Sequence, residues 1–177
     1  MSLTFRPAVA ADVEQIYRML VALADHDHGQ VKGGTESIAR YGFGPEPMFR
    51  VILAEQDTVP VGLCLFVPEY SSWRGQIGVY VQDLYVAESA RGLGLGRALL
   101  AEAARSGRDW EAQFLTLMVQ RNNEIGLGFY NAQGFELRGD SRWVVLEGDA
   151  LARLIAGTGQ DDQEPVNTSL PASGVLP

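Results

Sequence analysis

The residues whose types and spacing point most directly to chemistry form a glycine-rich stretch, Arg91-Gly92-Leu93-Gly94-Leu95-Gly96-Arg97. It lies between a predicted strand and a predicted helix. Backbone amides at a helix start are unpaired hydrogen-bond donors, and the helix dipole favours an anion there. Glycines lack side chains, so a bulky phosphate can approach their backbone closely. The stretch therefore predicts a pyrophosphate cradle, with a flexible strand-to-helix turn as the alternative.

Two familiar phosphate-binding motifs do not fit this stretch. A dinucleotide fingerprint needs Gly-x-Gly-x-x-Gly, but its third glycine is replaced by Arg97 in one frame and by Leu99 in the other. The Gly-Lys-Ser/Thr of a P-loop is also absent from the sequence. The spacing thus favours an anion site without naming its ligand.

Other residues with chemical potential give weaker signals. The run Asp25-His26-Asp27-His28 resembles a metal site, but alternating residues at a helix end rarely converge on one ion, so no metal is expected. The single cysteine, Cys64, excludes a disulfide framework. Trp73 and Trp143 are candidates for an aromatic wall against a cationic amine, or for the core or a dimer interface.

The elements that position these residues follow from apolar periodicity and turn signals. Asp12 is expected to cap the first helix, with Gln15 at the capping-box position, and Gly134 is expected to close the helix after the last central strand. Helices are predicted over 10–28, 35–44, 96–110, 122–135 and 149–157. Strands are predicted over 3–8, 48–56, 60–70, 76–88 and 114–120, with a last hairpin over 135–139 and 142–148.

This order predicts an α/β (α+β) domain with a single mixed sheet. A mostly antiparallel sheet is followed by a β-α-β unit, with helices on both faces of the sheet. Residues 1–157 are expected to form one domain. Residues 158–177 contain few large apolar residues and are expected to be a flexible tail.

Composition excludes several classes of function. The 177 residues carry a net charge of −8, which disfavours a nucleic-acid partner because phosphate contacts need clustered Lys and Arg. No apolar run approaches membrane-spanning length, and the first residues lack a secretory signal pattern. A cytoplasmic protein without a membrane partner is therefore expected.

In this context the chain resembles the GNAT acetyltransferase superfamily. The superfamily signature, Gln/Arg-x-x-Gly-x-Gly/Ala, is filled in register by Arg91, Gly94 and Gly96. The resemblance extends from Phe5 to about Leu154. The segments RPAVAAD, YGFGPEP, QDLYV and RWVVL are similar to the branch of diamine (spermidine/spermine) and thialysine N-acetyltransferases. The resemblance implies splayed central strands, acetyl-CoA as the acetyl donor and a homodimer.

The resemblance also implies which residues hold the cofactor. The amides of residues 92–97 would bind the pyrophosphate of CoA, and the backbone of residues 84–86 would pair with the pantetheine arm as an added strand does. Asn123 would contact the cofactor, with residues 124–126 beside it. The implied cofactor-binding residues are Leu84, Tyr85, Val86, Arg91, Gly92, Leu93, Gly94, Leu95, Gly96, Arg97, Asn123, Glu124 and Gly126.

Two residues would carry the proton transfers. Tyr130 is the implied proton donor to the CoA sulfur, with a core aromatic as the alternative. The diamine branch has Glu-Asp where this chain has Gln82-Asp83, and glutamine cannot act as a base. Asp83 is therefore the candidate proton acceptor, with a structural ion pair as the alternative. Neighbouring strand residues face opposite sides of a sheet, so its direction is open.

The acceptor side is implied by the same resemblance. The expected function is transfer of an acetyl group to a primary amine of a small molecule, either a polyamine or a lysine-like amino acid. The alternatives are a peptide or protein amine, an aminoglycoside-type drug, or a CoA-binding sensor with little turnover. The implied substrate-binding residues are His26, Asp27, Gln82, Asp83 and Trp143.

Overall fold

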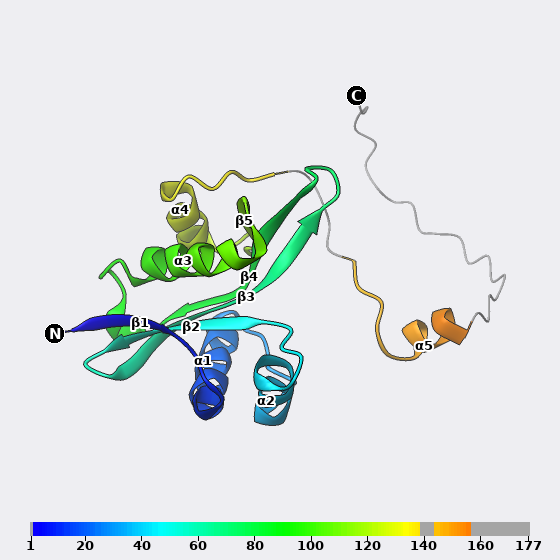
Figure 1. The fold of residues 1–177 in the computed structure, drawn as a ribbon, viewed down its shortest axis with the longest axis horizontal. Coiled ribbons are helices and arrows are strands. Elements are labelled where there is room, and N and C mark those ends of the chain that lie inside the picture. Colours follow the sequence, from blue (N-terminus) through cyan, green and yellow to red (C-terminus); the bar gives the residue numbers. More distant parts are fainter. Residues whose placement is uncertain (1, 139–143, 157–177) are drawn as a thin grey trace. The chain divides into compact units, whose positions relative to one another are not determined.

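The computed structural model describes residues 2–138 and 144–156, and the chain divides into two compact units, residues 1–135 and 136–177. The first unit contains a five-stranded sheet in the order β1-β2-β3-β4-β5 (Figure 1). Its strands are β1 (Leu3–Pro7), β2 (Arg50–Gln56), β3 (Val59–Ser71), β4 (Gln76–Val86) and β5 (Phe114–Leu117). Its helices are α1 (Val13–His26), α2 (Thr35–Phe43), α3 (Leu95–Ser106) and α4 (Glu124–Ala132), with 3-10 turns η1 (Ala10–Asp12), η2 (Glu88–Ala90) and η3 (Gly107–Trp110).

The sheet has the predicted mixed topology. Strands β1 to β4 pair antiparallel, and β5 joins β4 in parallel after the chain has crossed over through α3. Helices α1 and α2 cover one face of the sheet, and α3 and α4 cover the other (Figure 1). The expectation of a mostly antiparallel sheet with helices on both faces is confirmed.

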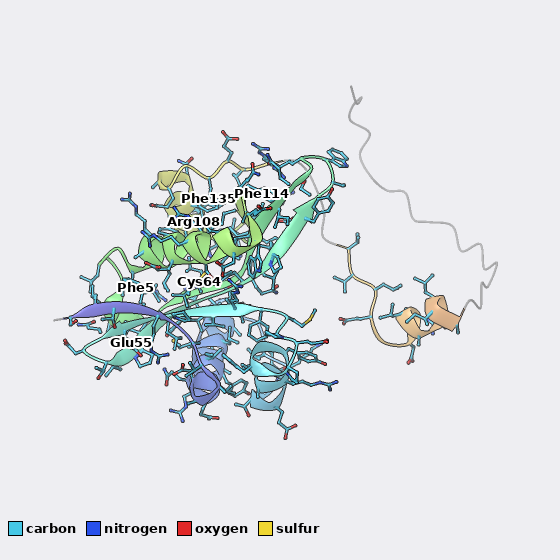
Figure 2. The ribbon with its side chains drawn as sticks, viewed as in Figure 1. Phe5, Glu55, Cys64, Arg108, Phe114 and Phe135 are labelled. Atoms are coloured by element: carbon cyan, nitrogen blue, oxygen red, sulfur yellow. The ribbon has the colours of Figure 1, made fainter. Side chains whose placement is uncertain are left out.

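Each face of the sheet has its own core because strand side chains alternate. In β2, Ile52 and Ala54 pack in the core under α3, while Val51 and Leu53 pack against α1 and α2. Figure 2 labels Cys64 of β3, which is fully buried in the core under α3. We call the core under α3 the α3 core, and the core under α1 and α2 the α1 core.

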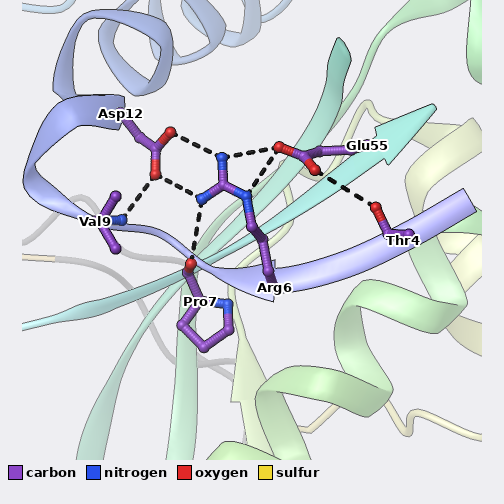
Figure 3. Close-up of polar contacts among 6 residues, drawn as sticks. All are labelled: Thr4, Arg6, Pro7, Val9, Asp12 and Glu55. Atoms are coloured by element: carbon purple, nitrogen blue, oxygen red, sulfur yellow. Dashed lines mark hydrogen bonds and ion pairs between the residues drawn. The ribbon is translucent and has the colours of Figure 1, made fainter. Parts of the chain in front are cut away.

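A partly buried charge network lies at the start of α1 (Figure 3). The Arg6 guanidinium donates to both carboxylate oxygens of Asp12, at 2.7 and 2.9 Å, and its Nε donates to Glu55 at 2.9 Å. Asp12 also accepts from the Val9 amide at 2.8 Å. The expected capping box with Gln15 is therefore wrong: Asp12 precedes α1, but its side chain makes no cap hydrogen bond because Arg6 occupies it. The guanidinium lowers the pKa of Asp12.

The end of the last central strand and the predicted last hairpin differ most from the structure. Strand β5 ends at Leu117 rather than at residue 120, which shortens the parallel pairing. The described parts of the predicted last hairpin, residues 135–138 and 144–147, contain no strand, and the middle of the hairpin lies outside the described residues. In the second unit, α5 (Gly148–Ala156) confirms the predicted final helix. The positive φ of Gly134, +87°, is consistent with the expected stop after α4.

Candidate active site

A cavity of about 630 Å³ opens where β4 and β5 separate. The parallel pairing runs only from Gly78↔Phe114 to Val81↔Leu117, whereas β4 continues to Val86. Beyond Val81, none of the described strands pairs with the edge of β4 that faces β5. The cavity is lined by the end of α1, by β4 and the glycine-rich stretch after it, and by the residues from the end of β5 through α4.

Gly92 and Gly94 supply the backbone geometry of the glycine-rich stretch. Their φ angles are +79° and +77°, in the left-handed region that side chains other than glycine's rarely adopt. A Cβ built on either residue would meet no atom within 4 Å, so backbone conformation rather than crowding accounts for glycine at both positions. Gly94 is the N-cap of α3, and both glycines line the cavity.

The first turn of α3 presents free donors beside the cavity. The first backbone hydrogen bond from the body of α3 to its cap runs from the Ala98 amide to the Gly94 carbonyl, at 3.1 Å. The preceding amides of residues 95–97 therefore have no partner within the helix. The first turn contains no acidic residue, and Gly94 offers no side-chain cap. Together with the helix dipole, these donors form a site that fits an anionic group such as a pyrophosphate.

Gly96 has a different role from the other two glycines. A Cβ at Gly96 would lie 3.1 Å from the Phe129 ring of α4, so this glycine allows α3 and α4 to pack closely. Arg91 donates from Nε to the Val86 carbonyl at 3.2 Å, which ties the stretch to the end of β4. Leu93 is exposed and does not line the cavity, whereas Leu95 and Arg97 do.

A bulge in β4 decides where Asp83 points. The pairing between β3 and β4 shifts between Phe66↔Val81 and Leu65↔Asp83, which leaves Gln82 as the extra residue. Leu65 belongs to the α1 core, so its partner Asp83 lies on the face of the sheet that carries α1. Both Gln82 and Asp83 line the cavity.

Asp83 is a carboxyl group in a low-dielectric site. Burial raises the pKa of Asp83 to about 6. Its side chain makes no ion pair or hydrogen bond with any described residue, so nothing in that part of the chain supports the structural ion pair. A partly buried carboxyl with a raised pKa that lines a cavity is a candidate proton acceptor.

Tyr130 enters the cavity from α4. Its ring packs edge-on against Phe129 and Phe135, with centroid distances of 5.1 and 5.5 Å. Its hydroxyl has no hydrogen-bond partner among the described residues. Every fully buried side-chain oxygen or nitrogen in the described chain does have a partner, so the Tyr130 hydroxyl is not fully buried and is open to the cavity that Tyr130 lines. Burial first, and then the acidic groups of Cys64 and Asp27, raise the pKa of Tyr130 to about 12. The ring of Tyr130 thus packs as a core aromatic does, while its hydroxyl remains an available hydrogen-bond donor.

Asn123 caps the helix that carries Tyr130. Its Oδ1 accepts from the Gly126 amide at 2.8 Å, and its Nδ2 donates to no described residue. Asn123 and Gly126 both line the cavity. Glu124 lines a second cavity of about 370 Å³ beside the first. Asn123 was expected from the resemblance, but its capping role follows only from the fold.

The end of α1 brings the expected acceptor residues to the cavity. His26 and Asp27 line it, and His26 Nδ1 lies 3.0 Å from an Asp27 carboxylate oxygen. The described residues contain no cluster that would hold a metal ion. Trp143 lies outside the described residues. Trp73 is 100% exposed and does not line the cavity, so the expected aromatic wall is wrong for Trp73.

Several lining residues were not found from the sequence. Leu23, Leu117, Met118, Phe129 and Gln133 line the cavity. No sequence pattern distinguishes the four apolar residues from ordinary core residues, and the single polar residue, Gln133, belongs to no recognisable motif.

The open sheet, the amide cradle and the cavity between β4 and β5 define a transferase of the GNAT class. The chain belongs to the acetyltransferase (GNAT) family, whose model matches residues 15–135. It is therefore an acyltransferase of the N-acetyltransferase family. None of the described helices is long and apolar enough to cross a bilayer.

The relatives agree with the branch expected from the sequence. The chain is 30% identical to a thialysine N-epsilon-acetyltransferase from Bos taurus over 162 residues, which cover 84% of this chain and 95% of the relative. It is 25% identical to a human spermidine/spermine N(1)-acetyltransferase-like protein 1 over 151 residues, covering 80% of this chain and 22% of that protein. The fold is similar to that of an integron cassette protein of V. cholerae, with a TM-score of 0.72, 21% identity and coverage of 88% and 98%.

Proposed function

We propose that this protein transfers the acetyl group of acetyl-CoA to a primary amine of a small molecule, either a polyamine or a lysine-like amino acid. One observation carries the proposal: a single cavity combines free amide donors at the start of α3, an unpaired edge of β4, the Asp83 carboxyl and the Tyr130 hydroxyl. A thioester donor needs the amides for its phosphates and the strand edge for its arm, and the attack of an amine on it needs a proton acceptor and a hydrogen-bond donor to the sulfur.

The donor site is formed mostly by backbone. The amides of residues 92–97 hold the pyrophosphate, with Arg97 beside it. The edge of β4 at residues 84–86 pairs with the amide-containing arm of the donor, because that edge lacks a strand partner. Asn123 offers its free Nδ2 to the same arm. When bound, the donor supplies an acetyl group activated as a thioester.

Asp83 removes the proton that prevents the amine from attacking. An alkylamine has a pKa of about 10.4, so roughly one molecule in 10³ is neutral at pH 7. With a pKa of about 6, Asp83 is mostly ionised at that pH and accepts the extra proton of the ammonium group, directly or through water. The neutral amine then attacks the thioester carbonyl, the new C–N bond forms, the C–S bond breaks, and the nitrogen releases its second proton to solvent to give the amide. Asp83 then returns the proton to solvent.

Tyr130 stabilises the departing sulfur. A thiol has a pKa of about 8.5, whereas the pKa of Tyr130 is about 12. Complete proton transfer from Tyr130 to the thiolate would therefore cost about 5 kcal/mol. Tyr130 instead donates a hydrogen bond to the thiolate, which receives its proton from solvent to give the free thiol. Its raised pKa keeps the hydroxyl protonated at neutral pH.

The acceptor enters from the end of α1. His26, Asp27 and Gln82 border that side of the cavity, and the Asp27 carboxylate would attract an ammonium group. The amide of Gln82 binds without exchanging protons. Trp143 remains a predicted substrate contact.

Release of free CoA thiol from acetyl-CoA tests the function with a panel of amines. Diamines, polyamines and lysine analogues should raise the rate above the background of hydrolysis. A peptide N-terminus, a protein lysine or an aminoglycoside as the best acceptor would overturn the small-amine assignment. Acetyl-CoA binding without turnover on any amine would identify a sensor instead.

Three further expectations from the sequence remain proposals. We propose a homodimer, which light scattering tests, and a cytoplasmic location, which cell fractionation tests. We also propose that residues 1–157 are the acetyltransferase domain. A chain truncated after Gly157 should then keep its thiol-release activity.

A further inference from the structure

The inner end of the cavity lies where the two strands meet. Pairing between β4 and β5 begins at Val81↔Leu117, and both residues line the cavity. As register partners in a parallel ladder they lie on the same face, and both pack with the α3 core. The open groove therefore ends against two adjacent branched side chains.

The direction of the donor leads to this point. In the proposed function the pyrophosphate lies at residues 92–97 and the donor arm runs back along β4 from Val86 to Leu84. The thioester then reaches Asp83, and the next step along β4 toward the closed end of the groove is Val81, beyond the unpaired Gln82. The acyl group consequently lies against Val81 and Leu117.

The material behind these two residues is closely packed. Val81 is 3% exposed, and the next pair in the ladder on the same face, Val79↔Leu115, packs in the same core. Packed cores do not yield to an extra methylene without strain. The other side of the reacting carbonyl is bordered by His26, Asp27 and Asp83, where the amine must enter. A longer acyl chain that continues along β4 would therefore have to displace packed side chains of the α3 core.

We propose that Val81 and Leu117 form the floor of the acyl pocket and restrict the donor to short acyl chains such as acetyl. This inference rests on the proposed function, because it uses the direction of the donor. One additional methylene against an apolar pocket wall changes discrimination by roughly 10–200-fold. We therefore expect acetyl-CoA to bind at least roughly tenfold more tightly than butyryl-CoA.

The test measures binding of acetyl-CoA and butyryl-CoA by isothermal titration calorimetry without any amine present. The Leu117→Ala variant removes the isopropyl group at the floor and should reduce the ratio of the two affinities by roughly tenfold. The matched control is Leu115→Ala, which makes the same deletion two residues earlier on the same face but away from the cavity. It should keep the wild-type ratio. Val81→Ala makes an equivalent opening from β4 if Leu117→Ala does not fold.

The outcomes separate this inference from the function on which it rests. Equal binding of both donors by the wild type, or the same ratio in Leu117→Ala and Leu115→Ala, would overturn the acyl floor even if amines are acetylated. A preference for acetyl-CoA that Leu117→Ala reduces and Leu115→Ala leaves unchanged supports the acyl floor, even if no tested amine reacts. If neither acyl-CoA binds, the proposed function and the acyl floor both fail.

Discussion

Asp83 pairs with Leu65 directly beside a bulge in which Gln82 has no partner. Because Leu65 belongs to the α1 core, this pairing places the Asp83 carboxyl on the face of the sheet where α1 ends. Asp83 and the Gln82 that stands in place of the glutamate both line the cavity, and Asp83 is the one of the two with a carboxyl group, whose pKa is raised. The relationship gives this chain its own candidate proton acceptor.

Substitution of Asp83 by Asn should lower kcat/KM by roughly 10²–10⁴-fold, the usual contribution of a general base. The wild-type rate should rise as the pH increases through about 6, because only the ionised carboxyl accepts a proton. Thiol release measured as a function of pH checks both effects. The neighbouring variant Gln82→Ala should keep the rise near pH 6. A pH profile that is the same in wild type and Asp83→Asn would rule out Asp83 as the base.

The same substitution should make the protein more stable at neutral pH. Burial raises the folded-state pKa of Asp83 from 3.8 to about 6, so the folded protein holds a proton that the unfolded chain releases over this range. Stability conferred by this site is present below about pH 4 and is lost as the pH rises through about 6. The free energy of unfolding of Asp83→Asn should exceed that of the wild type by about 1–3 kcal/mol at pH 7 and should equal it below about pH 4. Thermal melts at both pH values check this; an equal gain at both would contradict it.

Substitution of Tyr130 by Phe removes the donor but keeps the ring that packs against Phe129 and Phe135. The variant should lose roughly 10²-fold in kcat, as when an oxyanion donor is removed, with little change in acetyl-CoA affinity or melting temperature. Turnover and calorimetric binding, measured on the same preparation, separate these effects. Loss of affinity in proportion to turnover would mean that Tyr130 is structural.

Substitution of Gly94 by Ala forces a side chain into a left-handed conformation at the N-cap of α3. The variant should lose about 1–2 kcal/mol of stability, and its affinity for acetyl-CoA should fall as the amide cradle distorts. Gly128→Ala is the matched control, because Gly128 is an exposed helical glycine in α4 with open space around its Cβ position. That control should gain up to about 1 kcal/mol and bind normally. Similar binding losses in both variants would count against a special role of Gly94.

The sequence by itself determined the class of the fold and predicted the donor side of the candidate site. Glycine spacing between a strand and a helix is local information, and so are the period of α3 and the alternation of β4. Local geometry alone sets the free amides and the left-handed glycines, which is why Gly92 and Gly94 could be assigned before the structure. The resemblance placed Asn123 and Tyr130 on the helix that follows β5.

Only the tertiary structure decided the direction of Asp83 and the depth of the groove. A bulge depends on how one strand pairs with another, so no pattern within β4 tells which of Gln82 and Asp83 is the extra residue. The end of β5 at Leu117 was likewise set by pairing rather than by propensity, since the apolar run continues to Val119. The capping carboxylate of Asp12 was diverted to Arg6, a contact across strand and helix. The strand pairings are long-range and the Arg6–Asp12 contact depends on the turn between β1 and α1, so all of them exist only once the chain has folded.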